Sequence, residues 1–161
     1  MSSSDYVKRV DRLVVDANIL IGAVLGGEDG ATRTLIARLL ASGIALFAPE
    51  ELATELDEHL PRLIQRQLAA RFPTFRQDEA LTAAHAIWQD MLEAVNVIPA
   101  GDYHSLAAHA RRRVPADPDD WPYVALALRL DCGILTKNLA HFGASGIPIW
   151  SLETVRLLVE E

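Results

Sequence analysis

The 161-residue sequence predicts an α/β protein, a three-layer α/β/α sandwich built on a mainly parallel sheet of about five strands. Short apolar runs alternate along the chain with longer segments whose apolar residues recur at helical spacing. The loops between them are short, which is typical of a parallel sheet covered by helices on both faces. We expect one domain at residues 11–161, preceded by a flexible, Ser-rich stretch at residues 1–10.

The first predicted strand ends in an acid. The apolar run Leu13–Val15 leads directly into Asp16, and ligand sites of open α/β sheets lie just beyond the C-terminal ends of the strands. An ionised Asp at such a place is costly unless it is paired or binds a cation. The residues alone fit a second interpretation equally well, in which Asp16 caps the following helix and Asn18 is exposed.

The later elements follow from spacing and from helix-end residues. Gly43 ends a helix as a C′ glycine does. We expect Pro49 at the first position of the next helix, with Glu50 and Glu51 in the turn where the helix dipole favours acids. In chain order we predict helices at 17–25 and 32–42, a strand at 44–48, a helix from 49 that extends or restarts over 63–70, a helix at 77–92, a strand at 95–98, a helix at 104–113, a turn at 114–120, a helix at 123–130, a strand at 133–136, a short helix or turn at 138–142, a strand at 146–150 and a closing helix at 152–159.

Composition narrows the class of protein. The formal net charge of −7 gives no general basic field for nucleic acid, although a local arginine patch beside bound metal ions can still hold a phosphate backbone. The single Cys132 excludes an intramolecular disulfide, and we expect it to be a core residue in a reducing compartment. No apolar run approaches the roughly 18 residues that a membrane span requires, and no export signal is visible. We therefore expect a cytoplasmic protein.

Polar side chains lie next to four predicted strand ends or helix starts. The carboxylate, amide and hydroxyl oxygens of these side chains suit the hard cations Mg²⁺ and Mn²⁺. No Cys and His cluster has zinc-ligand spacing, and we expect the five histidines on the surface or in packing roles. Glu51 and Glu55 share one helix face, and Leu52 and Leu56 mark the buried stripe beside it, which places Glu55 near the core edge. The four groups are Asp16 with Asn18, Glu51 with Glu55, Asp117 to Asp120, and Thr136 with Asn138.

Four of these segments, in this order, resemble the PIN-domain family of metal-dependent ribonucleases, which includes the VapC-type toxins of bacterial toxin–antitoxin pairs. The resemblance runs from about Leu13 to Trp150. Each segment alone is weakly specific, whereas the four together over this length are fairly specific. The segments are Val14–Leu20, Pro49–Leu56, Asp117–Ala127 and Ile134–Asn138.

The resemblance implies a set of catalytic acids that bind Mg²⁺ or Mn²⁺. Asp16, Glu55 and Asp120 look like its three acids, with Glu51 as the substitute for Glu55. Asp117 resembles an extra acid found in a subset of the family, or it simply caps the helix that starts at the following proline.

Three further residues are expected to support that site. Asn138 stands where many PIN domains have Asp, so it still offers an oxygen to a cation but removes one negative charge. Asn18 is expected to position a water molecule, and Thr136 to hold the acids through hydrogen bonds.

For function, the resemblance implies hydrolysis of RNA, with single-stranded or looped RNA as the substrate because the scissile phosphate must enter a recessed cluster. A small antitoxin and a homodimer through the apolar helices 32–40 and 81–92 are the expected protein partners. Two alternatives stay open: a non-catalytic PIN-like binding module, and a haloacid-dehalogenase-like phosphatase, which position 18 disfavours because it is Asn and not a second Asp. The cations for RNA are expected at Arg111, Arg112 and Arg113, unless these only end a solvated helix, or at Arg62, Arg66, Arg71 and Arg76 along the middle helices.

Overall fold

The computed structural model describes residues 10–26, 30–71 and 76–160 and shows an α/β fold around a five-stranded sheet. All strand pairs are parallel, and the spatial order is β3-β2-β1-β4-β5. The predicted fold class is therefore confirmed, while the predicted flexible stretch lies almost wholly outside the described residues. The strands are β1 (Arg12–Val15), β2 (Ala45–Pro49), β3 (Asn96–Ile98), β4 (Gly133–Leu135) and β5 (Ile149–Trp150).

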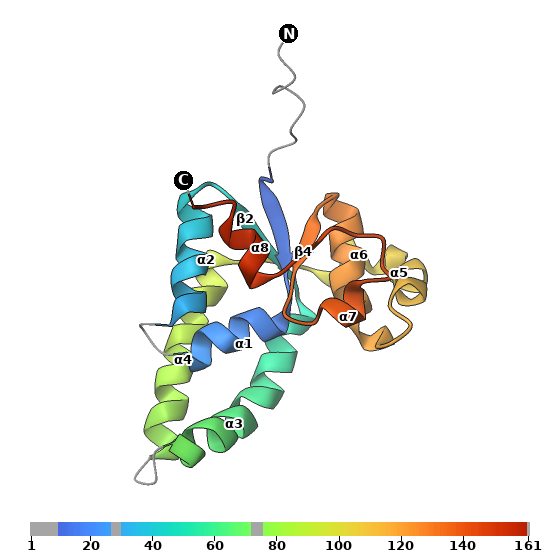
Figure 1. Ribbon diagram of the computed structural model, residues 1–161. Coiled ribbons are helices and arrows are strands. Elements are labelled where there is room, and N and C mark those ends of the chain that lie inside the picture. The colour runs from blue at the N-terminus through green and yellow to red at the C-terminus, as the bar shows by residue number, and fades with distance from the viewer. Residues whose placement is uncertain (1–9, 27–29, 72–75, 161) are drawn as a thin grey trace.

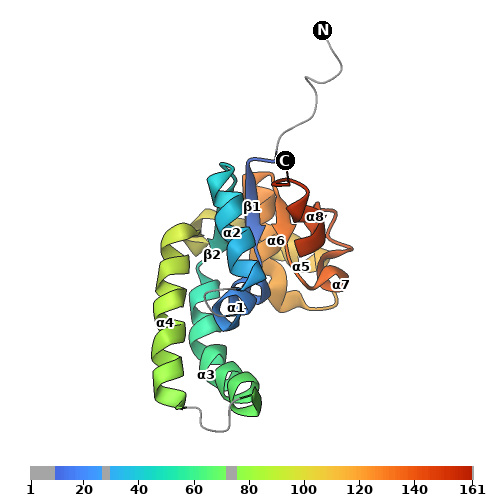
Figure 2. The ribbon, with the colours of Figure 1, turned by 60° about the vertical axis from the view of Figure 1, so that its left-hand side comes forward.

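Helices cover both faces of this sheet. Figure 1 shows α5 and α6 on one side and α2 and α4 on the other, and α6 packs directly on β1, β2 and β4. Helices α3 and α4 lie against each other and extend beyond the sheet (Figures 1 and 2). The helices are α1 (Ala17–Leu25), α2 (Ala31–Ala41), α3 (Glu51–Arg71), α4 (Gln77–Ala94), α5 (Ala107–Arg113), α6 (Trp121–Leu130), α7 (Leu139–Phe142) and α8 (Leu152–Arg156), with 3₁₀ turns at Ala100–Asp102, His104–Leu106 and Pro118–Asp120.

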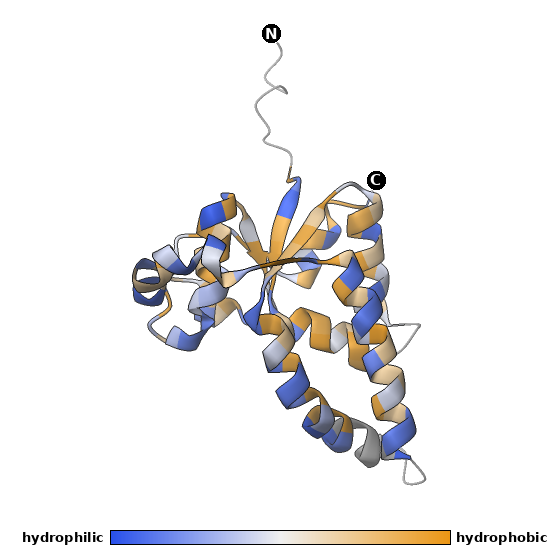
Figure 3. Ribbon diagram, turned by 180° about the vertical axis from the view of Figure 1, so that it is seen from behind, coloured by the Kyte–Doolittle hydropathy of each residue, from blue (hydrophilic) through white to orange (hydrophobic). Residues whose placement is uncertain are grey.

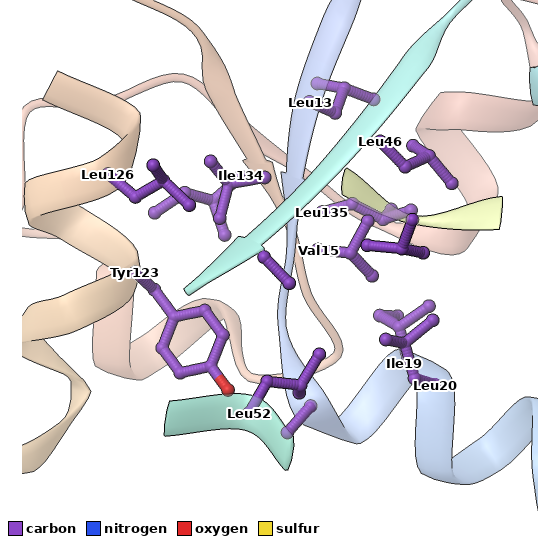
Figure 4. Packing of buried hydrophobic residues seen from close by; sticks show 14 of the residues in the cluster. Leu13, Val15, Ile19, Leu20, Leu46, Leu52, Tyr123, Leu126, Ile134 and Leu135 are labelled. Carbon is purple, nitrogen blue, oxygen red and sulfur yellow. The ribbon is translucent and has the colours of Figure 1, made fainter. Parts of the chain in front are cut away.

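The core follows from strands that are apolar on both faces. Leu13, Val14 and Val15 of β1 are completely buried, as expected for the central strand of a parallel sheet. Figure 4 shows Ile134 beside Leu126 on the α6 side, with Val15 on the opposite side. Figure 3 shows the same arrangement at larger scale, with hydrophobic strands enclosed by helices that carry hydrophilic outer faces.

The strand order places a ligand site. The chain leaves β1 for β2 and β3 on one side, then returns to the other side of β1 for β4 and β5. The reversal lies between β1 and β4, and in open α/β sheets ligands bind at the C-terminal strand ends beside such a switch point. The backbone joins the two ends here, because Asp16 N donates to Leu135 O at 3.0 Å.

Pro49 differs from its predicted place, whereas at Pro61 the helix extends, which is one of the two predicted alternatives. Pro49 is the last residue of β2 and not the first of a helix, because the strand ladder continues through it, with Glu50 N donating to Ile98 O at 3.1 Å. Pro61 lies inside the continuous helix α3, so the helix does not restart. The carbonyl that loses its partner there belongs to Asp57, which is exposed and can bind water instead.

Several predicted ends also shift. Residues 104–106 form a 3₁₀ turn before α5, α6 begins at Trp121, β5 is only two residues long, and α8 ends at Arg156. These are changes at element ends, where local hydrogen bonding competes with the regular pattern. Among the described helices, none has both the length and the apolar content that crossing a bilayer demands.

Candidate metal centre

Asp16 lies at the end of β1 and is 5% exposed. It occupies the N-cap position of α1, yet its side chain makes no capping hydrogen bond to that helix. Instead the buried Thr136 hydroxyl donates to Asp16 Oδ2 at 2.7 Å, and the same hydroxyl accepts from Asn138 N at 2.9 Å. Thr136 thus connects the acid after β1 to the backbone after β4. Its hydroxyl donates to only one of the two carboxylate oxygens of Asp16.

Glu55 reaches the same place from α3. Tyr123, which is fully buried on α6, donates its hydroxyl to Glu55 Oε2 at 3.4 Å. Glu51, one turn earlier, turns away and accepts from the Tyr103 hydroxyl. Of the two acids that the sequence offered on this helix, Glu55 is the one that lines the pocket at the strand ends.

A tighter group lies across the pocket. Ligand atoms of Asp117, Asp120 and His141 all lie within 4.8 Å of one another. His141 Nδ1 is 3.2 Å from Asp120 Oδ2 and 3.9 Å from Asp117 Oδ2. Asn138 Nδ2 is 2.7 Å from the same His141 nitrogen. Asp16 and Glu55 face this group without belonging to it.

One pocket of about 430 Å³ is lined by the acids Asp16, Glu55, Asp117 and Asp120 together with Asn138 and His141. It lies at the C-terminal ends of β1 and β4, where the strand order reverses. A smaller pocket of about 220 Å³, lined by Cys132 and Trp150 among others, lies at the opposite end of these strands. The larger pocket is lined by Asp16, Ala17, Asn18, Ile21, Glu55, His59, Arg62, Leu63, Arg66, Asp117, Asp120, Asn138 and His141.

Burial disfavours the ionised form of three acids of this pocket, Asp16, Glu55 and Asp120. Desolvation, with the negative charge of Asp120, raises the pKa of Asp16 from 3.8 to about 6, against the lowering effect of the Thr136 hydrogen bond. Desolvation and the charges of Asp16 and Asp120 raise the pKa of Glu55 from 4.5 to about 7. Desolvation also raises the pKa of Asp120, although its contact with His141 opposes the change.

The donor set fits a divalent cation. Carboxylates that are buried together and repel one another are stabilised as anions when a cation lies between them. Carboxylate and amide oxygens are the ligands that Mg²⁺ and Mn²⁺ take in proteins. Asp16, Glu55, Asp120, Asp117 and Asn138 supply such oxygens to one pocket, and His141 adds a nitrogen.

His141 and His59 also line the pocket, although from the sequence we expected both on the surface or in packing roles. His141 follows Asn138 by three residues within the short helix α7, a spacing that no general motif marks. His59, Arg62 and Arg66 do carry a signal, because they recur on α3 at the helical spacing that starts from Glu55.

The three predicted RNA-binding arginines of α5 lie elsewhere. Arg111 stacks on the Trp121 ring at 5.0 Å, and Arg112 lies 3.5 Å from His109. Arg113 donates to the Ser145 carbonyl at 2.7 Å and so holds the loop before β5. Arg62 and Arg66, and not these three, are the arginines that line the pocket among the described residues.

Comparison with known proteins agrees with the fold. No curated protein matches the chain. The family model described as PIN domain matches residues 14–160, from the middle of β1 to the last described residue. That match includes the end of β1, all of the other four strands and every acid of the pocket, and the chain therefore belongs to the PIN-domain family.

Proposed function

We propose that this protein is a metal-dependent endoribonuclease that hydrolyses phosphodiester bonds of RNA with Mg²⁺ or Mn²⁺. PIN domains are generally nucleases, which sets the reaction class. The observation that carries the proposal is the convergence of Asp16, Glu55 and Asp120, from β1, α3 and the start of α6, on one pocket. Burial there raises the pKa of each of these three acids.

The chain's own groups have separate roles in this scheme. Asp16 and Asp120 would hold the cation, and Thr136 fixes the Asp16 carboxylate through its 2.7 Å hydrogen bond. A bound divalent cation supplies Lewis acidity, which activates water and stabilises charge on a phosphodiester. Glu55, which lines the same pocket from α3, is the carboxylate that can accept a proton from water.

Cations beside the acids support an anionic substrate. Arg62 and Arg66 project from α3 on the helix face that also carries Glu55, and both line the pocket. In a chain with a net charge of −7, such a local pair is what can hold phosphates flanking the scissile bond. The recessed pocket of about 430 Å³ favours a single strand or loop over a duplex.

The test is cleavage of a labelled single-stranded RNA by purified protein with Mg²⁺ or Mn²⁺. We expect cleavage that stops with a chelator and falls by at least about a hundredfold in Asp16→Asn, because neutral Asn leaves the cation without its most buried charged ligand. Asp119→Asn is the matched control, since Asp119 is an exposed acid beside Asp120 that does not line the pocket. Cleavage that persists in chelator and in Asp16→Asn contradicts the proposal.

A further inference from the structure

We infer that Asp117, Asp120 and His141 form a second cation subsite that prefers a first-row transition metal ion over Mg²⁺, with His141 Nδ1 as its nitrogen ligand. The inference rests on the proposed function, which places a divalent cation in this pocket. It goes further by assigning a metal preference to one half of the pocket and by naming the side chain that sets it.

The distances within this group of three side chains allow them to share one ion. Two ligands at about 2.1 Å from an octahedral ion lie about 3 Å from each other. His141 Nδ1 is 3.2 Å from Asp120 Oδ2 and 3.9 Å from Asp117 Oδ2. These separations allow one ion to contact all three side chains after small rotations.

Packing and a backbone hydrogen bond hold the His141 imidazole in place. Phe142, the next residue of α7, is completely buried and packs edge-on against Tyr123 at 6.5 Å between ring centroids. His141 N donates to Asn138 O at 3.2 Å, which closes the turn that carries the ring. His141 therefore presents Nδ1 to the carboxylates from a fixed point, while about a third of its side chain remains accessible.

An ordinary His–Asp ion pair explains only part of this arrangement. A proton on Nδ1 serves one carboxylate, whereas Asp117 and Asp120 both present a carboxylate oxygen to the same nitrogen. A cation uses the nitrogen lone pair and both carboxylates together. The two carboxylates also balance the charge of a divalent ion, so the neutral Asn138 is compatible with occupancy.

The ligand types then decide which metal is preferred. Mg²⁺ favours carboxylate, carbonyl and water oxygens, whereas imidazole suits first-row transition metals. The Asp16 and Glu55 half of the pocket offers oxygen ligands, and Asp120 lies between the two halves. The subsite that contains His141 should therefore discriminate against Mg²⁺ more strongly than the half that contains Asp16.

The test measures metal binding without RNA. The affinities of Mn²⁺ and Mg²⁺ are determined by calorimetry, and pulsed electron paramagnetic resonance detects a directly bound ¹⁴N on Mn²⁺. In the unmodified protein we expect tighter binding of Mn²⁺ and a ¹⁴N signal. His141→Gln should remove that signal and weaken Mn²⁺ binding at this subsite by roughly ten- to a hundredfold, with a smaller effect on Mg²⁺.

Two further variants sharpen the result. His141→Asp makes the subsite all-oxygen, so Mg²⁺ affinity should rise and the ¹⁴N signal should be lost. His59→Gln is the matched control, because His59 lines the same pocket from α3 and should leave the ratio of Mn²⁺ to Mg²⁺ affinity unchanged. Thermal melting of each variant without metal checks that the fold is retained.

The inference fails if Mn²⁺ in the unmodified protein shows no ¹⁴N coupling, or if His141→Gln keeps the unmodified affinity ratio. Such a result, with RNA cleavage still abolished by chelator and by Asp16→Asn, leaves the nuclease proposal intact. Conversely, Mn²⁺ binding that depends on His141, in a protein that cleaves no RNA, supports the subsite and contradicts only the nuclease proposal.

Discussion

At the scale of single residues, the burial of the Asp16 carboxylate destabilises the folded protein when that carboxylate is ionised. Asp16 is almost completely buried, and its carboxylate has one side-chain hydrogen bond, from Thr136. A pKa of about 6 in place of 3.8 means that ionising Asp16 in the folded protein costs about 3 kcal/mol more than in the unfolded chain. A buried acid kept at such a cost is a feature of functional sites more often than of structural ones.

This cost predicts how stability depends on pH. The folded pKa of Asp16 exceeds the unfolded value, so its protonated form stabilises the protein fully below pH 3.8, and that contribution disappears as pH rises through about 6. Asp16→Asn removes the charge while the Asn oxygen can still accept from Thr136. We expect the variant without metal to be more stable than the unmodified protein by about 1–3 kcal/mol at pH 8, with little difference at pH 4.

Urea unfolding in the presence of a chelator, at both pH values, measures this difference. Asp119→Asn serves again as the control, because an exposed carboxylate should change stability by less than about 0.5 kcal/mol at either pH. An Asp16→Asn variant that is less stable than the unmodified protein at pH 8 contradicts the assignment of a desolvated carboxylate.

At the scale of elements, the site depends on how closely β4 lies against β5. A Cβ atom on Gly133 would lie 2.8 Å from the Pro148 carbonyl oxygen and 2.9 Å from two atoms of the Trp150 ring. Only glycine allows this approach, and β4 ends at Leu135, one residue before Thr136. The position of the Thr136 hydroxyl therefore depends on a backbone contact at the far end of its strand.

Gly133→Ala should destabilise the protein by about 1–3 kcal/mol, because one of the clashing atoms belongs to the backbone and cannot rotate away. Gly101→Ala is the matched control: nothing lies within 4 Å of its added Cβ, and we expect a change below about 0.5 kcal/mol. Midpoints of chemical unfolding for the two variants give the comparison. Equal midpoints would show that β5 moves aside without resistance.

At the scale of the whole molecule, the alternation of apolar runs and helical segments was enough to predict the parallel sandwich, whereas the resemblance to PIN domains singled out Asp16, Glu55 and Asp120. Sequence spacing holds no record of strand order, so the switch point between β1 and β4 needed coordinates. His141 was missed because it meets Asp120 only through the fold, 21 residues away in the chain. The apolar residues offered for a homodimer, such as Leu35 and Trp88, are buried in the protein's own core, and the dimer and the antitoxin stay predictions.

The positions of the arginines predict where RNA binds. The sequence offered two sets of arginines, Arg111–Arg113 and a set on the middle helices, and the pocket is lined by Arg62 and Arg66 of the second set. Each phosphate contact by a cation adds roughly 0.7 to the slope of log affinity against log salt for a single strand. In an Asp16→Asn background, which we expect to prevent cleavage, replacing Arg62 and Arg66 by Gln should weaken RNA binding and lower that slope by about 1.4. Arg76→Gln is the control, since Arg76 lies outside the pocket and pairs with Glu79 at 3.4 Å. If replacing Arg111 and Arg112 lowers the slope instead, the RNA follows α5 and not the pocket face of α3.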